Sequence, residues 1–227
     1  LYARSADSYT FSPRAGGARR QYPTFNPFIP CISVLSDLGV FINDAAVTRG
    51  MRGFYIGRFQ PYHDGHHRMV TEIAEEVDEL VLGIGSAGDS HVPRNPFTAG
   101  ERVMMVTKSV AELDITTYAV PIEDLDRNAV WVSHVRSMSP AFDVAYSNNP
   151  LVIQLFSEAG VEVRQSPMFN RDVLEGAELR ERMIRGDDWQ RLVPPAVVDV
   201  IEEIDGIERI QRVSDSDATG DGAGDPE

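Results

Sequence analysis

The segment 57–67, with the sequence GRFQPYHDGHH, brings together side chains that can bind phosphate. It follows a short apolar run, so His63 and His66 are expected on either side of the start of a helix. The free N–H groups and the positive dipole end of such a helix start favour an anion. Gly65 removes a side chain where the backbone would approach a phosphate closely. Together with Arg58, these residues predict a phosphate-binding site.

Two other interpretations of His63 and His66 are open. They could be polar residues of a surface loop, or they could bind a metal as paired histidines do. The metal interpretation is the weaker one, because the chain has only three other histidines and a single cysteine, Cys31. We therefore expect a phosphate site, and no metal held by protein side chains.

A second glycine-rich segment, GIGSAG at 83–88, matches the dinucleotide-binding fingerprint G-x-G-x-x-G and follows an apolar run. The fingerprint requires a helix that opens at the glycines, because the helix start binds the pyrophosphate. Here Val92, Pro93 and Pro96 follow, and the next helix signal comes only near Thr98. The segment is therefore expected to be the end of a strand, where glycines let a nucleotide lie against the backbone, and not the site of a dehydrogenase.

Short apolar runs alternate with helical patterns through the middle of the chain. Strands are expected at 53–57, 79–84, 115–120, 142–146 and 161–164. Helices are expected at 65–77, 98–110, 129–138 and 151–158, and again from 176 onward with breaks at Gly186 and Pro194-Pro195. This alternation is typical of an α/β fold, a Rossmann-like, doubly wound parallel sheet. Ligands of such sheets bind beyond the carboxyl ends of the strands, where segment 57–67 is expected to lie.

The composition of the chain excludes several classes of protein. Its 227 residues carry a net charge of -14 and a pI near 4.7, which excludes a nucleic-acid-binding protein that acts through bulk positive charge. The single cysteine excludes a disulfide framework, and no apolar run approaches the roughly 18 residues of a transmembrane helix. Only Lys108 is a lysine among the 21 basic residues. This composition indicates a protein that works in concentrated salt, where screening keeps the acidic surface from repelling anionic substrates.

The two ends of the chain differ from its middle. Residues 1–50 carry 5 Arg and 3 Asp and lack a periodic apolar pattern, and Met51 stands directly before the first predicted strand. We interpret them as a disordered leader or as the result of a misplaced start site, not as a domain. Residues 214–227 hold five acidic and no basic residues, which predicts a disordered acidic tail. The folded domain is therefore expected to span 51–213.

The HDGH sequence at 63–66, placed after a first strand, resembles the His-x-Gly-His signature of the nucleotidylyltransferase superfamily. The longer segment 57–66 is similar to the archaeal type of nicotinamide-nucleotide adenylyltransferase. Three further segments resemble the same family: SHVPRNPFTAGER at 90–102, NAVWV at 128–132 and YSNNPLV at 146–152. The resemblance covers about residues 51–213. It implies the nucleotidylyltransferase type of the fold, in a cytoplasmic enzyme of NAD biosynthesis.

The resemblance implies that the chain transfers AMP from ATP to nicotinamide mononucleotide, forming NAD and releasing pyrophosphate. Such a reaction needs no covalent intermediate, but two polyanions must be brought together in line and the charge on the leaving pyrophosphate must be neutralised. The catalytic residues that the resemblance implies are His63, His66, Arg58 and Arg180. A Mg²⁺ ion would be held mainly by the ATP phosphates and by water.

The implied binding residues divide between the two substrates. Those for ATP are Gly57, Arg58, Phe59, Gln60, His63, Gly65, His66, Arg94 and Arg180. Those for the nicotinamide nucleotide are Gly85, Asp124, Asn128, Trp131 and Asn149. Trp131 would stack on the nicotinamide ring. Arg94 is preferred over Arg102 as a phosphate ligand, because Arg94 lies in a loop bounded by prolines whereas Arg102 belongs to an acidic helix.

Near Arg180 the sequence departs from the family pattern. Glu175 and Ala177 stand where the family has hydroxyl residues, which leaves the backbone N–H groups of this helix start to contact phosphate. A nucleotide-binding regulator that has kept the fold and lost turnover is therefore one alternative, although Arg58 and both histidines are intact. Another is a transferase of the same superfamily that acts on phosphopantetheine or riboflavin phosphate. The resemblance also suggests a homo-oligomer, such as a hexamer, and no nucleic-acid or membrane partner is expected.

Overall fold

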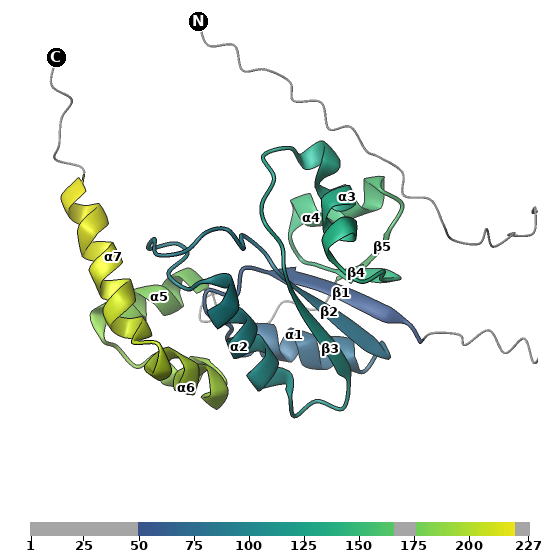
Figure 1. Ribbon diagram of the computed structural model, residues 1–227. Coiled ribbons are helices and arrows are strands. Elements are labelled where there is room, and N and C mark those ends of the chain that lie inside the picture. The colour runs from purple at the N-terminus through teal and green to yellow at the C-terminus, as the bar shows by residue number, and fades with distance from the viewer. Residues whose placement is uncertain (1–49, 166–175, 221–227) are drawn as a thin grey trace, which may run out of the picture. The chain divides into compact units, whose positions relative to one another are not determined.

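The computed structural model describes residues 50–165 and 176–220 of the chain (Figure 1). The predicted leader up to residue 49 and the departure from the family pattern at Glu175 lie outside these residues. Of the predicted acidic tail, residues 221–227 lie outside them as well.

A five-stranded parallel sheet forms the centre of the described chain (Figure 1). Its strands are β1 (Arg52–Gly57), β2 (Glu79–Ile84), β3 (Thr116–Pro121), β4 (Val144–Tyr146) and β5 (Glu162–Arg164). The spatial order is β3-β2-β1-β4-β5 and every neighbouring pair is parallel, so the predicted Rossmann-like sheet is confirmed. The chain moves outward from β1 to β3 and then crosses back to β4. The carboxyl ends of β1 and β4 therefore form the switch point at which such sheets bind ligands.

Helices cover both faces of this sheet, as a doubly wound fold requires. One face carries α1 (Asp64–Ala74), α2 (Ala99–Val110) and the C-terminal helices α5 (Gly176–Arg185), α6 (Pro195–Glu203) and α7 (Gly206–Gly220). The other face carries α3 (Asn128–Met138) and α4 (Pro150–Glu158) (Figure 1). None of the described helices is long and apolar enough to cross a membrane.

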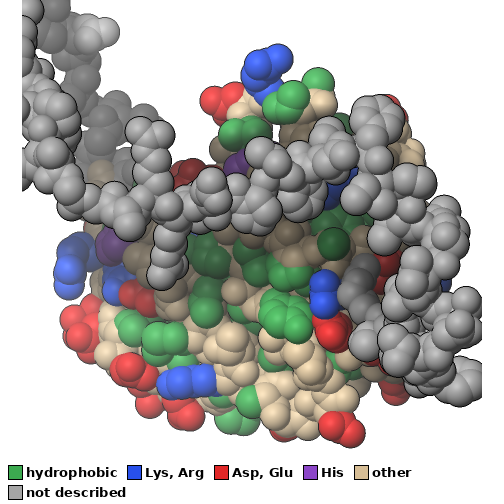
Figure 2. All heavy atoms as spheres, turned by 45° about the vertical axis from the view of Figure 1, so that its right-hand side comes forward, with side chains coloured by type: hydrophobic (Ala, Val, Ile, Leu, Met, Phe, Trp, Pro, Cys, Tyr) green, Lys and Arg blue, Asp and Glu red, His purple; other side chains and the backbone are tan. Residues whose placement is uncertain are grey.

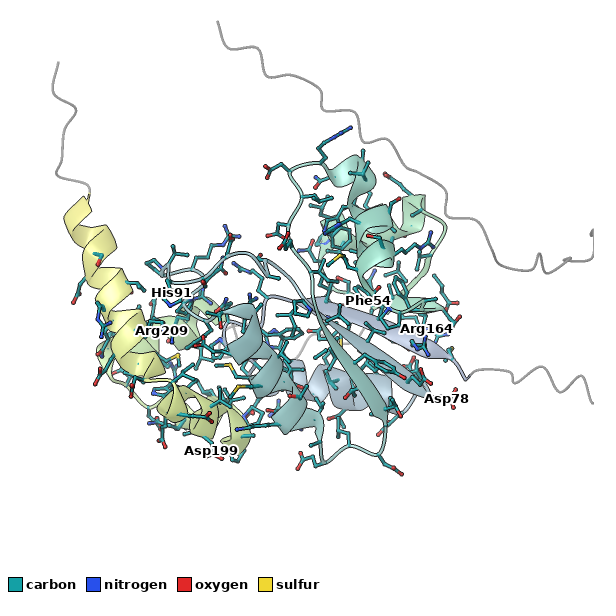
Figure 3. All side chains as sticks on the ribbon, in the orientation of Figure 1. Phe54, Asp78, His91, Arg164, Asp199 and Arg209 are labelled. Atoms are coloured by element: carbon teal, nitrogen blue, oxygen red, sulfur yellow. The ribbon has the colours of Figure 1, made fainter. Side chains whose placement is uncertain are left out.

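Two hydrophobic clusters hold the helices to the sheet. Because successive side chains of a strand point to opposite faces, Leu80 and Leu82 of β2 join the cluster under α1 and α2, while Val81 joins the one under α3 and α4. Phe54 of β1, labelled in Figure 3, is fully buried in the second cluster and stacks on Phe142. The strands read as nearly continuous apolar runs because both of their faces are covered.

A capping box opens α2 at Thr98, where the sequence places the start of a helix. The Thr98 Oγ1 accepts a hydrogen bond from the backbone N–H of Glu101 (3.3 Å), and the Thr98 N–H donates to Glu101 Oε2 (2.8 Å). Arg209 of α7, labelled in Figure 3, donates to the same carboxylate oxygen at 2.6 Å. This contact ties the C-terminal helices to the start of α2, which borders the predicted phosphate site.

The helical region after residue 176 differs from the prediction at two places. The expected breaks at Gly186 and before Pro195 are present, but a further break at Asp205 (φ 51°) separates α6 from α7. In addition, α7 continues to Gly220, so the predicted end of the folded domain at residue 213 is too early. Most of the added residues are polar, but extending an existing helix costs far less than starting one.

Acidic side chains lie at the surface of the molecule. In Figure 2 they are spread around the margin of the visible face. Among the described residues no Asp or Glu is buried, whereas Arg102, Arg180 and His63 are. The acidic groups of the described residues thus lie outside the core, and two positive groups, Arg102 and Arg180, lie inside it near the predicted site.

Candidate active site

His63 and His66 together cap the start of α1. His63 is the N-cap residue, and its Nδ1 accepts a hydrogen bond from the backbone N–H of Gly65 (3.1 Å). His66 Nδ1 accepts in turn from the backbone N–H of His63 (3.4 Å). This is a capping box built from two imidazoles instead of the usual hydroxyl and carboxylate. Because each Nδ1 acts as an acceptor, the proton of each neutral ring lies on Nε2, which makes Nε2–H the donor for a ligand.

Burial keeps both histidines uncharged. Their rings stack with centroids 3.7 Å apart, and His63 is only 7% exposed. Burial, with a smaller contribution from the charge of Arg180, lowers the pKa of His63 to about 4. Burial and the neighbouring His63 likewise hold the pKa of His66 well below its usual value. At neutral pH the pair therefore offers two uncharged N–H donors and no positive charge of its own.

The lowered pKa of His63 predicts a loss of stability in acid. A histidine whose pKa falls on folding stabilises the native state above its unfolded pKa of about 6.5, and this contribution is lost as the pH falls from there towards 4. For His63 we expect a loss of about 2–3 kcal/mol in the free energy of unfolding between pH 7 and pH 4.5. Urea unfolding of the wild type and of His63→Asn at the two pH values measures it.

Asparagine can still cap a helix but does not titrate, so His63→Asn should lose about 2–3 kcal/mol less than the wild type over this pH interval. Acidic side chains that titrate in the same interval are common to both proteins and cancel in the comparison. Equal losses in the two proteins would contradict a buried, neutral His63.

Three arginines converge beside the histidine pair: Arg58 from the loop after β1, Arg94 from the loop after β2 and Arg180 from α5. Burial and then the charge of Arg94 lower the pKa of Arg58. Burial, Arg58 and Arg94 together lower the pKa of Arg180 to about 10, so Arg180 stays charged at neutral pH. The Arg180 Nη1 donates to the backbone carbonyl of Gln60 (2.9 Å), which holds α5 against the loop after β1.

Gly176 leaves room for the Arg180 guanidinium at the start of α5. A Cβ at position 176 would lie 3.2 Å from Arg180 Nη1, closer than most such contacts. Ala177, one of the two departures from the family pattern, is exposed on the first turn of the same helix. The position of Arg180 thus does not depend on the residue type at 177.

The side chains of Phe59 and Gln60, two of the predicted ATP ligands, face the interior. The Gln60 amide is bonded on both sides to the backbone of Phe97, with its Nε2 donating to the carbonyl (2.9 Å) and its Oε1 accepting from the N–H (3.0 Å). Phe59 is 1% exposed and packs edge-on against the His66 ring. Both residues hold the loop in place, so a nucleotide could meet them only through their backbone.

The end of β2 lies against the end of β1 and carries a second polar group. The backbone N–H of Gly85 donates to the carbonyl of Gly57 (2.9 Å), and the next residue, Ser86, donates its hydroxyl to Asp124 Oδ2 (2.6 Å). Asp124 lies close enough to Arg58 to raise its pKa against the effect of burial. The glycine-rich segment is followed by loop up to Ala99, where α2 begins, so no helix opens at the glycines, as expected.

A hollow of about 360 Å³ opens at the switch point between β1 and β4. It is lined by Tyr55, Ile56, Gly57, His66, Ser147, Asn148, Asn149 and Pro150. Asn149 is the N-cap of α4, and its Oδ1 accepts from the N–H groups of Leu151 (2.9 Å) and Val152 (3.4 Å). The structure thus brings three predicted residues, Gly57, His66 and Asn149, to one cavity.

The first turns of α3 lie elsewhere. Asn128 lines a separate hollow of about 310 Å³ between α3 and the end of α4, together with Ala129, Val132, Ser133, Leu155, Glu158 and Ala159. Trp131 is half-buried and packs edge-on against Phe156, with centroids 5.4 Å apart. The described geometry therefore does not place these two residues in the hollow with His66, and their contact with a nicotinamide ring remains a prediction.

Sequence reasoning set Arg102 aside as a phosphate ligand and did not foresee its burial behind the site. Arg102 is fully buried, and its guanidinium donates to the backbone carbonyls of Arg58, Gly85, Ser86 and Thr98. A signal was present, because Arg102 shares the buried face of α2 with Met105, Val106 and Ser109 at helical spacing. An arginine on an apolar helix face must find hydrogen-bond acceptors inside the protein.

Known proteins resemble this chain closely. The cytidylyltransferase-like family model matches residues 54–203. The nicotinamide-nucleotide adenylyltransferase of Halorubrum lacusprofundi is 78% identical over 170 residues, which are 75% of this chain and 97% of that protein. The protein of the same name from Methanolobus tindarius is 60% identical over 73% of this chain and 96% of its own length.

A solved structure shares the fold. It is a bifunctional NMN adenylyltransferase/ADP ribose pyrophosphatase from Francisella tularensis, complexed with AMP and a manganese ion. It matches 74% of this chain and 54% of its own chain with a TM-score of 0.63 and 16% identity. At this identity the likeness concerns the fold alone.

Proposed function

Because the chain belongs to the cytidylyltransferase-like family, we infer that its site transfers the AMP moiety of ATP to nicotinamide mononucleotide, forming NAD and pyrophosphate. Relatives that carry this activity in their name are 56–78% identical to it. The match includes 97% of the Halorubrum protein, so nearly the whole of that enzyme has a counterpart here. The observation that carries the inference is the group of Arg58, Arg94 and Arg180 around the neutral His63–His66 pair.

The reaction joins two anionic groups and releases a third. An oxygen of the 5′-phosphate of nicotinamide mononucleotide attacks the α-phosphorus of ATP, and the bond from that phosphorus to the β-phosphate bridging oxygen breaks. The electron pair leaves with pyrophosphate, so no covalent enzyme intermediate is needed. Catalysis of this kind rests on holding the two phosphates in line and on stabilising the charge that moves to the leaving group.

We assign the histidine pair to the charge that develops on the phosphates. The two Nε2–H groups are fixed in direction by the capping box, so they need no reorganisation when the transition state forms. They are neutral before ATP arrives, and the negative charge of bound phosphate would raise the pKa of both rings. Arg58, Arg94 and Arg180 would supply the permanent positive charge, and their planar forks suit bidentate contact with phosphate.

We propose that the divalent cation is Mg²⁺ and that it arrives on the ATP phosphates. In the part of the chain that the structure describes, no three His, Cys, Asp or Glu side chains are grouped as a metal site. The residues present therefore fit a cation bound by substrate oxygens and water, as Mg²⁺ often is. When bound, it would neutralise charge on the phosphates.

The nicotinamide nucleotide is assigned to the side of the site near the switch point. Asn149 opens the hollow beside His66, and Asp124, held by Ser86, faces Arg58. A ligand in this hollow would present its phosphate to His66. Asn128 and Trp131 are assigned to the nicotinamide end on the family resemblance alone, because neither lines this hollow.

The purified chain is expected to make NAD from ATP and nicotinamide mononucleotide with Mg²⁺ in molar KCl, as measured by chromatography of the products. Parallel reactions with phosphopantetheine and with riboflavin phosphate test the other acceptors. The matched control is His66→Ala, which removes one Nε2–H donor. No NAD above this control would overturn the proposed function, and turnover of another acceptor in place of nicotinamide mononucleotide would redirect it.

A further inference from the structure

Arg102 occupies an unusual position for a charged side chain. It is 0% exposed, at the end of the first turn of α2, directly behind the loops that carry the proposed phosphate-binding groups. Its Nη1 donates to the carbonyls of Arg58 (2.8 Å) and Gly85 (2.7 Å), and its Nη2 donates to that of Ser86 (3.0 Å). Its Nε donates to Thr98 (3.2 Å). One guanidinium thus joins the ends of β1 and β2 to the start of α2.

No carboxylate neutralises Arg102 at close range. Among the described residues none lies within salt-bridge distance of it, and Asp89 and Asp124 act on it only from farther away. Burial lowers the pKa of Arg102 to about 10, so the group stays charged at neutral pH. Four backbone carbonyl groups solvate this charge in place of water. The positive field of the Arg102 guanidinium extends into the proposed nucleotide site.

The carbonyls that Arg102 binds belong to strained parts of the backbone. Phe59 and Ser86 both have φ 49°, a region that residues with a side chain seldom adopt. Arg102 Nη1 holds the peptide group before each of them, the one between Arg58 and Phe59 and the one between Gly85 and Ser86. Such conformations persist only where the surroundings enforce them, and they cluster at functional sites.

Each strained residue adjoins a group of the proposed active site. The first strained peptide begins at Arg58, so its geometry sets where the Arg58 side chain leaves the backbone. The second fixes Ser86, whose hydroxyl holds Asp124 at 2.6 Å. The same guanidinium therefore fixes the positions of two groups that face each other across the ends of β1 and β2: the Arg58 cation and the Asp124 carboxylate.

We propose that Arg102 is a positioning residue of the nucleotide site: it holds the Arg58–Phe59 and Gly85–Ser86 peptides in their strained conformation, and so aligns Arg58 and Asp124 for the substrates. This inference rests on the proposed function for its kinetic readout. It assigns no contact between Arg102 and a substrate, because its four hydrogen bonds all point to backbone carbonyls.

The test compares Arg102→Lys with the wild type in molar KCl. Lysine keeps the charge but cannot span four carbonyls in a planar fork. We expect kcat/KM to fall about 10- to 100-fold, while the circular dichroism spectrum stays that of the folded protein. Arg102→Gln, which keeps a planar donor without the charge, serves as a second variant if the lysine protein does not fold. The matched control is Met105→Ala, at a fully buried site on the same face of α2 and outside the nucleotide site.

Met105→Ala should lower Tm through the cavity it leaves, and it should keep kcat/KM within about twofold of the wild type at temperatures well below Tm. If Met105→Ala loses as much activity as Arg102→Lys at an equal loss of Tm, general destabilisation explains the result and the proposal fails. It fails equally if Arg102→Lys keeps wild-type kcat/KM.

A double-mutant cycle with Arg58→Ala distinguishes a positioning role from a merely structural one. A merely structural role of Arg102 would produce no coupling between the two substitutions in kcat/KM. If Arg102 acts through Arg58, Arg102→Lys should reduce kcat/KM about 10-fold less in the Arg58→Ala background than in the wild type. Equal reductions in both backgrounds would overturn the proposal. The same cycle is also measured on the Kd of ATP by calorimetry. If the chain binds ATP without making NAD, the proposed function is contradicted, but the Kd values still test the role of Arg102.

Discussion

His66→Ala is expected to lower kcat by about 10²-fold or more, because one preorganised donor to developing charge typically contributes that much. The capping box directs the Nε2–H of His66 by engaging its Nδ1, and the ring lines the hollow at the switch point. The loss should appear mainly in kcat, since the donor matters most when charge moves to the leaving group. Measurement of kcat and KM for both substrates in molar KCl tests it.

Two further variants separate the lost donor from a damaged helix start. His66→Gln can still accept from the His63 N–H as glutamine does in an ordinary capping box, so it should recover Tm without recovering kcat. His67→Gln changes the next residue, which pairs with Glu112 and Tyr62 away from the hollow, and should keep kcat within about twofold. Full activity in His66→Ala would show that this ring is not in the site.

Arg180→Met should have the second large effect, in two measurements at once. Loss of the buried, permanently charged guanidinium group should lower kcat/KM for ATP by about 10²-fold. Burial is the main cause of the low pKa of His63, about 4, and the charge of Arg180 adds to it, so removal of this charge should raise that pKa while burial still holds it below its ordinary value. Titration of the His63 ring protons by NMR follows the second effect directly, without any substrate.

The neighbouring Arg182→Met is the control for Arg180→Met. Arg182 lies two positions farther along the same helix, so it does not share a face with Arg180, and it is paired with Glu178 (2.9 Å). We expect it to change neither kcat/KM nor the pKa of His63 beyond experimental error. A His63 pKa that is the same in Arg180→Met and the wild type would refute the proximity of Arg180 and His63 on which the proposed site depends.

Local sequence patterns were sufficient to predict most of the elements. Helix α2 begins where its capping box places it, and β2 spans its predicted residues because an apolar run bounded by polar residues suits a strand buried on both faces. The break at Asp205 and the length of α7 were missed. An αL residue other than glycine leaves little trace in sequence, and the extension of a helix by polar residues depends on the part already formed.

The helix start within 57–67 was also predictable from the chain itself. The spacing of His63, Gly65 and His66 over a strand–helix junction depends on only a few consecutive residues, so the sequence alone determined a helix start suited to phosphate. The capping box made by two imidazoles refined that prediction. It explains why both rings are present and which nitrogen of each remains for a ligand.

Tertiary structure alone decided which distant residues join this motif and which do not. Arg180 meets Gln60 across 120 positions of sequence, and Arg102 reaches the ends of two strands, because the order of the strands and the packing of α2 and α5 bring them there. The same packing turned Phe59 and Gln60 inward. Spacing along the chain governs contacts within one turn or one strand, whereas the burial and direction of a side chain depend on everything packed around it.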